Sequence, residues 1–89
     1  KAAIIGLTKQ LAYEVAKHNI NINAVCPSQT ATDMLLDSMS HEEQEELIKN
    51  IPLNRIARVN DQVGPILFLC SDAASYITGT YIDINGGQI

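Results

Sequence analysis

Apolar residues recur at helical spacing from the beginning of the chain. One stripe of a helix with a period of 3.6 residues would hold Ile4, Leu7, Leu11 and Val15. Residues 17–19, Lys-His-Asn, supply basic side chains and a C-terminal cap for this helix. Because neither a Met nor a capping residue starts the helix, we expect it to be a cut element and the chain to be a fragment.

An apolar run rich in β-branched residues follows the first helix. The run Ile20 to Cys26 alternates Ile with Asn before it ends in Ala-Val-Cys, and Pro27 closes it, which predicts a strand. The next stretch, Ser28 to Ser38, is polar and has no clear period. We therefore expect a loop there, with a short helical turn near residues 34–36.

A second helix is predicted over residues 41–49. Ser40 followed by Glu43 matches a capping box, in which each side chain satisfies a backbone N–H group of the other residue. The helix carries acids that could form a cation site or an acid/base site: Glu42, Glu43, Glu45 and Glu46. A solvated helix face is the interpretation that this charge run favours.

A third helix is predicted after a connector over residues 51–59, and it opens at Asn60 or Asp61. Its apolar positions at helical spacing are Val63, Ile66, Leu67 and Cys70. Pro65 removes a backbone donor and crowds the preceding turn, so we expect it to delay or bend the first turn.

The final elements set the fold class. A short turn runs through Ser75, and residues 81–84 predict a last strand that ends at the Asn-Gly-Gly of residues 85–87. Strands joined through helices argue for a parallel pair in an α/β fold. Parallel sheets need several strands with both faces covered, so we expect the chain alone to be an incomplete domain.

The composition is that of an ordinary globular chain. Its 89 residues (9.7 kDa) are 46% hydrophobic and 18% charged, which excludes a disordered or low-complexity protein. The net charge of −4 argues against nucleic acid as a partner, because a negative surface repels phosphate. No apolar run approaches the ~18 residues of a membrane span, so we expect a soluble chain with no membrane partner.

The cysteines and histidines indicate neither a disulfide framework nor a metal site. Cys26 and Cys70 form no CxxC pair, and we expect each to be a small buried residue in a reducing cytosol. Together with His18 and His41 they show no metal-ligand spacing, so no metal is predicted. The expected location is the cytoplasm.

Short motifs follow one another along nearly the whole chain. They are KAA at 1–3 with GLT at 6–8, INAVCP at 22–27, IPL at 51–53 with Arg55 and Arg58, FLCSD at 68–72, ASYITG at 74–79 and DINGG at 83–87. Each motif is weak, but the ordered set is specific, and it resembles the short-chain dehydrogenase/reductase family. The resemblance implies a Rossmann-type, doubly wound parallel sheet that binds NAD or NADP. This chain would be the C-terminal part of that single domain, incomplete as given.

The resemblance makes Lys1 a catalytic and cofactor-binding residue. It matches the lysine of the family's Tyr-x-x-x-Lys motif, whose Tyr belongs four positions ahead of Lys1, as the Gly-rich phosphate turn and the catalytic Ser belong further ahead. In the family this lysine hydrogen-bonds the nicotinamide ribose and lowers the pKa of the Tyr. A nearby cation favours phenolate, which otherwise forms only near pH 10 or so. Considered as a residue alone, an N-terminal lysine is a solvated charge.

The second site implied by the resemblance is the loop after the first strand. By this resemblance, the residues that would line the nicotinamide and pyrophosphate side of the cofactor are Pro27, Ser28, Thr30 and Thr32. Backbone groups of Thr30 would hold the carboxamide, and the Thr32 hydroxyl would donate to cofactor oxygens. Ser28 replaces the family's usual glycine, where its Cβ could crowd the cofactor or its hydroxyl add a hydrogen bond. The residues alone describe an ordinary polar turn, at the strand end where α/β sheets bind ligands.

The following loop, residues 31–39, corresponds to the family's variable substrate lid. Its apolar residues are Met34, Leu35, Leu36 and Met39, which either cover an apolar substrate or pack on the domain. Both alternatives stay open, and neither the substrate nor the choice between NAD and NADP is predicted.

Two functions follow from these patterns. The first is an oxidoreductase that transfers a hydride between NAD(P) and an alcohol or ketone, assembled as a homo-oligomer (a dimer or tetramer). The 89-residue chain by itself is expected to be inactive, because the Tyr, the Ser and the phosphate turn are not in it. The alternative is a non-catalytic interaction module of the same family, which would associate through the first helix, the third helix and the last strand.

Overall fold

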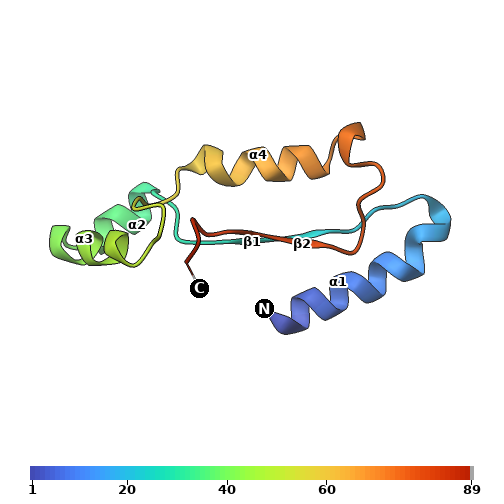
Figure 1. The fold of residues 1–89 in the computed structure, drawn as a ribbon, viewed down its shortest axis with the longest axis horizontal. Helices are drawn as coiled ribbons and strands as arrows, with labels where there is room; N and C mark the ends of the chain where they lie inside the picture. The colour runs from blue at the N-terminus through green and yellow to red at the C-terminus, as the bar shows by residue number, and fades with distance from the viewer. Residues whose placement is uncertain (89) are drawn as a thin grey trace. The chain divides into compact units, whose positions relative to one another are not determined.

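The computed structural model describes residues 1–88, which form two compact units. The first unit holds residues 1–26 and 64–82, and the second holds residues 27–63 and those from 83 onward. The elements, in chain order, are α1 (Ala2–Val15), η1 (Ala16–His18), β1 (Ala24–Pro27), α2 (Asp33–Ser38), α3 (His41–Lys49), α4 (Val59–Leu69), η2 (Asp72–Ala74) and β2 (Tyr81–Ile84) (Figure 1).

The two strands pair in parallel, as predicted. Within the first unit the Ala24 N–H donates to the Thr80 carbonyl at 3.0 Å, and within the second the Ser28 N–H donates to the Ile84 carbonyl at 3.1 Å. Both partners advance along the chain by the same step, which is the register of a parallel ladder. The predicted last strand, residues 81–84, coincides with β2.

The first strand begins at Ala24, later than the predicted start at Ile20. Before it, the segments are joined by one backbone bond, from the Gly79 N–H to the Ile22 carbonyl at 2.8 Å, and by side-chain bonds. The Asn23 side-chain amide donates to the Ile77 carbonyl at 3.0 Å, and its oxygen accepts from the Thr80 N–H at 3.1 Å. An amide side chain offers the same donor and acceptor as a peptide group, so it pairs these segments without forming a strand.

The predicted end of this strand at Cys26 is also wrong, because β1 includes Pro27. Backbone N–H groups alternate in direction along a strand. The N–H groups that donate toward the second strand belong to the even-numbered residues Ala24 and Ser28, whereas proline is at the odd-numbered position 27. The N–H group that proline lacks is therefore not one that this pair requires.

The ends of α1 and α3 follow the predicted signals. Asn19 has a left-handed conformation (φ 60°), and its N–H donates to the Ala16 carbonyl to close the turn after α1. At the start of α3, the Glu43 N–H donates to the Ser40 hydroxyl at 3.1 Å, and the Ser40 N–H donates to the Glu43 carboxylate at 3.3 Å. The predicted capping box is confirmed.

The predicted loop over residues 28–38 is wrong for its second half, where α2 forms. The helical turn expected near residues 34–36 extends over Asp33–Ser38. Thr32 is its N-cap, since its hydroxyl accepts from the Leu35 N–H at 3.3 Å.

The helix α4 begins at Val59, before the predicted Asn60 or Asp61. Asp61 nevertheless supplies the start signal, because its carboxylate accepts from the Arg58 N–H at 2.8 Å. Pro65 lies inside the helix and does not delay its first turn.

Few side chains are buried in either unit. Among residues 1–88 the buried ones are Thr8, Ala12, Ile51 and Ala74. In the first unit α1 and the second half of α4 lie on opposite sides of the strands (Figure 1). Part of each predicted apolar face is exposed, with Leu7 at 54% and Leu67 at 64%. Even so, none of the helices in these residues is long and apolar enough to span a bilayer.

The prediction that both cysteines are buried is wrong, because neither is fully buried. Cys26 is half-buried in β1, whereas Cys70, just after α4, is exposed. Both are free thiols.

Candidate functional site

Lys1 occupies the N-cap position of α1 in the first unit. Its Nζ lies 5.8 Å from the centroid of the Tyr81 ring, at the start of β2. At this distance the ring face attracts the ammonium group and limits where it can lie. The side chain is exposed, so its Nζ can be reached by a ligand.

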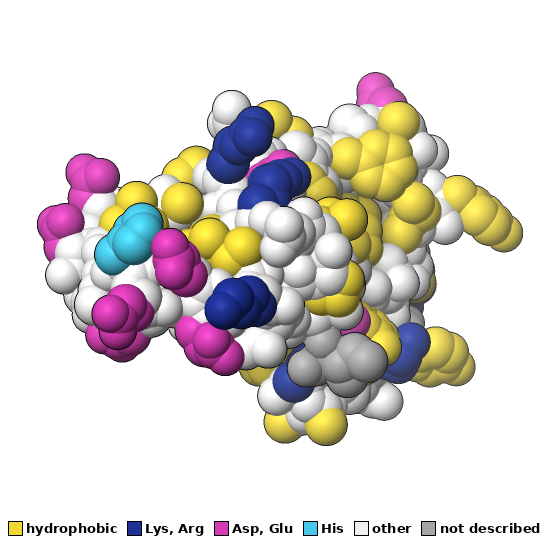
Figure 2. Space-filling view, turned by 60° about the vertical axis from the view of Figure 1, so that its left-hand side comes forward, with side chains coloured by type: hydrophobic (Ala, Val, Ile, Leu, Met, Phe, Trp, Pro, Cys, Tyr) yellow, Lys and Arg dark blue, Asp and Glu magenta, His cyan; other side chains and the backbone are white. Residues whose placement is uncertain are grey.

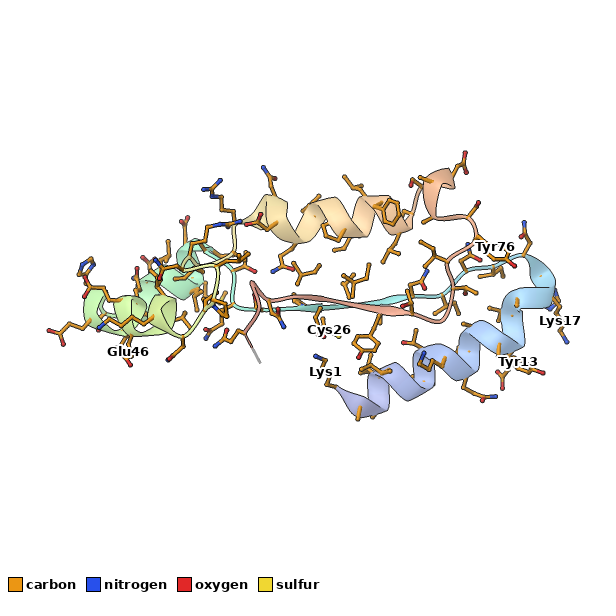
Figure 3. All side chains as sticks on the ribbon, viewed as in Figure 1. Lys1, Tyr13, Lys17, Cys26, Glu46 and Tyr76 are labelled. Atoms are coloured by element: carbon orange, nitrogen blue, oxygen red, sulfur yellow. The ribbon has the colours of Figure 1, made fainter. Side chains whose placement is uncertain are left out.

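A second Tyr-x-x-x-Lys spacing, Tyr13 to Lys17, lies within the chain. The two side chains lie at the end of α1 away from Lys1 (Figure 3), and Tyr13 is 83% exposed. From there the chain continues to the amino end of β1. Ligands of parallel sheets bind beyond the carboxyl ends of the strands, so this position is unsuited to catalysis. Lys1 remains the candidate lysine.

The loop from Pro27 to Thr32 lies in the second unit and turns tightly after β1. The Thr30 hydroxyl donates to the Ser28 carbonyl at 3.1 Å, and the Thr32 N–H donates to the Thr30 carbonyl at 2.8 Å. The structure thus brings Pro27, Ser28, Thr30 and Thr32 together on one short, internally bonded loop at the carboxyl end of a parallel strand. Lys1 belongs to the other unit, the first one.

Two groups of this loop have hydrogen-bonding capacity left for a ligand. The Thr30 N–H has no partner among residues 1–88. The Thr32 hydroxyl oxygen accepts from Leu35, but its own hydrogen has no acceptor within that part of the chain. A backbone donor and a hydroxyl donor two residues apart suit a ligand rich in carbonyl and phosphate oxygens.

Ser28 needs no glycine-like backbone. Among residues 1–88 the residues other than glycine with positive φ are Asn19 and Asn54, so Ser28 has an ordinary conformation. It lines a cavity of about 170 Å³ in the second unit, together with Ile51, Leu53, Arg55, Ala57, Asp61, Ile84, Asn85 and Gly86. Ser28 is half-buried and forms part of the wall of this cavity.

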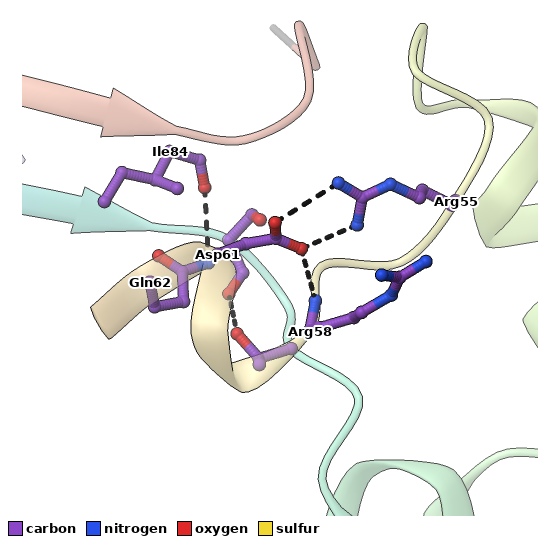
Figure 4. Close-up of polar contacts among 7 residues, drawn as sticks. Arg55, Arg58, Asp61, Gln62 and Ile84 are labelled. Atoms are coloured by element: carbon purple, nitrogen blue, oxygen red, sulfur yellow. Dashed lines mark hydrogen bonds and ion pairs between the residues drawn. The ribbon is translucent and has the colours of Figure 1, made fainter. Parts of the chain in front are cut away.

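The cavity wall includes an ion pair that the sequence patterns did not indicate. The Arg55 guanidinium donates twice to Asp61, with Nη1–Oδ2 at 2.6 Å and Nη2–Oδ1 at 3.2 Å (Figure 4). Bonds from Arg55 and then from the Arg58 N–H lower the pKa of Asp61 to about 2. The same bond with Asp61 raises the pKa of Arg55. Asp61 could be recognised from the sequence as an acidic residue in the first turn of a helix, where it can cap the helix. Nothing in the sequence indicated that Arg55, six residues earlier, would be its partner.

We expect this ion pair to make stability depend on pH in the acid range. The folded-state pKa of Asp61 lies below the ordinary value near 3.9, so its contribution is complete above about pH 4. The contribution is lost as the pH falls toward about 2. At pH 5, urea unfolding should give a higher free energy of unfolding for the intact protein than for its Asp61→Asn variant. Near pH 2 the two proteins should have the same free energy of unfolding. A constant difference between the two over this range would contradict the assignment.

The acids of α3 form a solvated face. Glu42, Glu43, Glu45 and Glu46 are all exposed, and His41 Nε2 lies 2.9 Å from Glu45 Oε1. Acidic side chains surround a histidine in Figure 2, and Glu46 points away from the helix in Figure 3. No cluster of three or more His, Cys, Asp or Glu suited to a metal ion occurs within residues 1–88.

A larger cavity of about 390 Å³ lies in the first unit. Its wall consists of Asn21, Ile22, Asn23, Val25, Ile66, Leu69 and Cys70. None of the residues predicted to act in catalysis or cofactor binding belongs to this wall.

Known proteins match the chain along nearly its whole length. Protein FixR of Bradyrhizobium diazoefficiens is 44% identical over 88 residues, which are 99% of this chain and 30% of that protein. A 3-oxoacyl-[acyl-carrier-protein] reductase of Rickettsia felis is 43% identical over 89 residues, 100% of this chain and 36% of that protein. The chain therefore spans about a third of the length of these curated relatives.

Solved structures show the same fold. A hydroxysteroid dehydrogenase from Escherichia coli superposes with a TM-score of 0.92 at 30% identity, over 100% of this chain and 37% of that one. A 3-oxoacyl-[acyl-carrier protein] reductase from Brucella melitensis gives 0.89 at 34% identity, over 98% and 32%.

The family model described as enoyl-(acyl carrier protein) reductase matches residues 1–88. Its match begins at Lys1 and includes the loop after β1. The resemblance and the Rossmann-type α/β fold expected from the motifs are thus confirmed. The chain belongs to the short-chain dehydrogenase/reductase family.

Proposed function

We propose that the intact protein carrying this chain is an NAD(P)-dependent oxidoreductase acting on an alcohol or ketone. The observation that carries the proposal is the 27–32 loop at the carboxyl end of a parallel strand. Within residues 1–88, its Thr30 N–H and its Thr32 hydroxyl hydrogen have no partner. The named activities of two relatives, a 3-oxoacyl reductase and a hydroxysteroid dehydrogenase, support a ketone or alcohol as the substrate class. The choice between NAD and NADP stays open.

The residues present fit a nicotinamide cofactor. The Thr30 N–H would hold the carboxamide oxygen, and the Thr32 hydroxyl would donate to a pyrophosphate oxygen while its oxygen still caps α2. Pro27 is exposed at the end of β1, and Ser28 is half-buried at the cavity wall. A bound NAD(P) would supply or accept the hydride.

Lys1 would act on the proton side of the reaction. At the N-cap of α1 its ammonium group adds to the positive end of the helix dipole. We propose that it hydrogen-bonds the ribose of the cofactor and stabilises the phenolate of the family's Tyr. That Tyr would then exchange a proton with the substrate oxygen. The 89-residue chain alone is expected to be inactive, and dinucleotide turnover by the pure 9.7 kDa species would contradict this part.

Replacing Thr32 by Val in the intact protein tests the cofactor site. The variant loses the donated hydrogen bond, and we expect the Kd for NADH or NADPH to rise about fivefold to tenfold. The Thr32→Ser variant keeps the hydroxyl and should bind like the parent, which separates the hydroxyl from the side-chain shape. Titration by quenching or enhancement of the reduced-nicotinamide fluorescence measures all three proteins. An intact protein that binds neither dinucleotide would disprove the proposed function.

A non-catalytic interaction module is the second candidate. The observation that favours it is the exposed apolar stripe of α1, with Ile4 at 56% and Leu11 at 37%. Contiguous exposed apolar surface marks contact sites. The same stripe would serve a homo-oligomeric enzyme, so light scattering of the intact protein is read together with the dinucleotide titration. Association without dinucleotide binding supports the module, and association with binding supports an oligomeric enzyme.

A further inference from the structure

We propose that Asp61 is a positioning residue for the loop that binds the cofactor. It would act through Arg55 and the segment between Arg55 and Arg58, without touching the cofactor. The cofactor part of the inference rests on the proposed function, whereas the positioning can be measured in the absence of any ligand. All of the contacts involved lie within the second unit.

The first step is that one carboxylate joins both ends of a short segment. Arg55 is held through its side chain, by bonds of 2.6 Å and 3.2 Å to the two oxygens of Asp61. Arg58 is held through its backbone N–H, at 2.8 Å from Oδ2 (Figure 4). Asp61 itself is fixed in the first turn of α4, where its own N–H donates to the Arg58 carbonyl at 3.0 Å. The Asp61 carboxylate therefore holds both ends of the segment from 55 to 58 against the first turn of α4.

The second step is that this segment holds the loop. Ala57, between the two arginines, forms an isolated parallel bridge with Thr30. The Ala31 N–H donates to the Ala57 carbonyl at 2.7 Å, a short hydrogen bond. Ala31 lies between the two threonines that would contact the cofactor. A shift of Ala57 therefore moves the Thr30 N–H and the Thr32 hydroxyl directly.

The third step is that the loop has two anchors, of which only one passes through Ala57. The Ser28 N–H donates to the Ile84 carbonyl as part of the strand pairing, which involves neither arginine. The Ala31 N–H is the anchor that depends on Ala57. Replacing Asp61 should therefore speed hydrogen exchange of the Ala31 amide and leave exchange of the Ser28 amide unchanged. This difference distinguishes a positioning role from a general loss of stability.

The Asp61→Asn variant tests the role because it keeps the shape of the side chain. An amide has one acceptor oxygen, and its NH₂ group would face the guanidinium donors of Arg55. Glu46→Gln is the matched control, since it also removes one carboxylate from the second unit and Glu46 is exposed. Arg55→Gln is a second test variant, which leaves the cap of Arg58 by Asp61 in place.

Hydrogen exchange of the intact protein without cofactor is the first measurement. In Asp61→Asn and in Arg55→Gln, we expect the Ala31 amide to exchange about fivefold to tenfold faster, as expected for loss of a charge-assisted bond. The Ser28 amide should exchange as in the parent and in Glu46→Gln. An unchanged Ala31 amide, or equal acceleration of Ala31 and Ser28, would overturn the positioning role.

Steady-state kinetics are the second measurement. Both variants should raise KM for the dinucleotide about fivefold to tenfold and keep kcat within about twofold, because saturating cofactor restores the loop. The double variant should be no worse than the more impaired single variant, since both act through one pair. A fall in kcat with KM unchanged would indicate only lost folded enzyme and overturn the role. If the parent binds neither dinucleotide, the proposed function fails, and exchange at Ala31 alone decides the coupling.

Discussion

Replacing Lys1 by Met is expected to lower kcat/KM of the intact protein about 100-fold to 10,000-fold. Met keeps the length of the side chain but removes the ammonium group, which lies at the N-cap of α1 beside the Tyr81 ring. Without a cation nearby, the phenol of the family's Tyr would return toward its ordinary pKa near 10 and donate or accept a proton less readily at neutral pH. Initial rates with NADH and NADPH from pH 6 to pH 10 measure the effect.

The matched control for this experiment is Lys17→Met. Lys17 is exposed in η1, at the other end of the same helical segment, and it follows Tyr13 at the same spacing (Figure 3). Its replacement should leave kcat/KM within about twofold of the parent. Loss of activity in Lys17→Met with an active Lys1→Met would reverse the assignment and make Tyr13 and Lys17 the pair to study.

The Gly86→Ala variant is expected to lower the free energy of unfolding by about 2–4 kcal/mol. Gly86 has φ +61°, a left-handed conformation that costs other residues about 1–2 kcal/mol. A Cβ there would lie 2.8 Å from Ile51 Cγ2, and Ile51 is 5% exposed and cannot easily move aside. The same turn is held by the Leu53 N–H, which donates to the Gly86 carbonyl at 3.0 Å. Urea unfolding of the intact protein measures the change.

Gly64→Ala is the control with the opposite expected sign. Gly64 lies inside α4, and a Cβ there would meet nothing within 4 Å. Alanine in a helix interior is more favourable than glycine by about 0.5–1 kcal/mol, so this variant should be slightly more stable. Equal destabilisation by both substitutions would show that the effect at residue 86 is not specific to its conformation or to Ile51.

Local signals in the sequence predicted most of the elements. The capping box at Ser40 and the strand at residues 81–84 depend on neighbouring residues alone, and both were confirmed. The start of β1 depends on Asn23, whose amide bonds to residues far along the chain, so no local pattern reports it. The start of α2 was readable in principle, because Thr32 is a common N-cap residue.

The sequence alone placed only part of the candidate site, the loop that follows the carboxyl end of one predicted strand. The resemblance named Lys1 and the loop from Pro27 to Thr32, and their roles stay predictions. The ion pair between Arg55 and Asp61 could not be predicted, because it forms where a connector of no regular period turns back onto a helix end. The exposure of Leu67 and Cys70 was likewise hidden, since helical spacing indicates an apolar face but not what covers it.

The side-chain bonds before β1 set an order of events during synthesis. The Ile22 N–H donates to the Thr78 hydroxyl 56 residues later, so it has no partner until that residue has been added. At about 5–20 residues per second, a ribosome needs about 3–11 s for that length. Helices form in about a microsecond, so α1 can form and melt many times while the strand edge beside it stays unpaired. For those seconds the Ile22 N–H can be satisfied only by water or by a temporary partner, because the Thr78 hydroxyl does not yet exist.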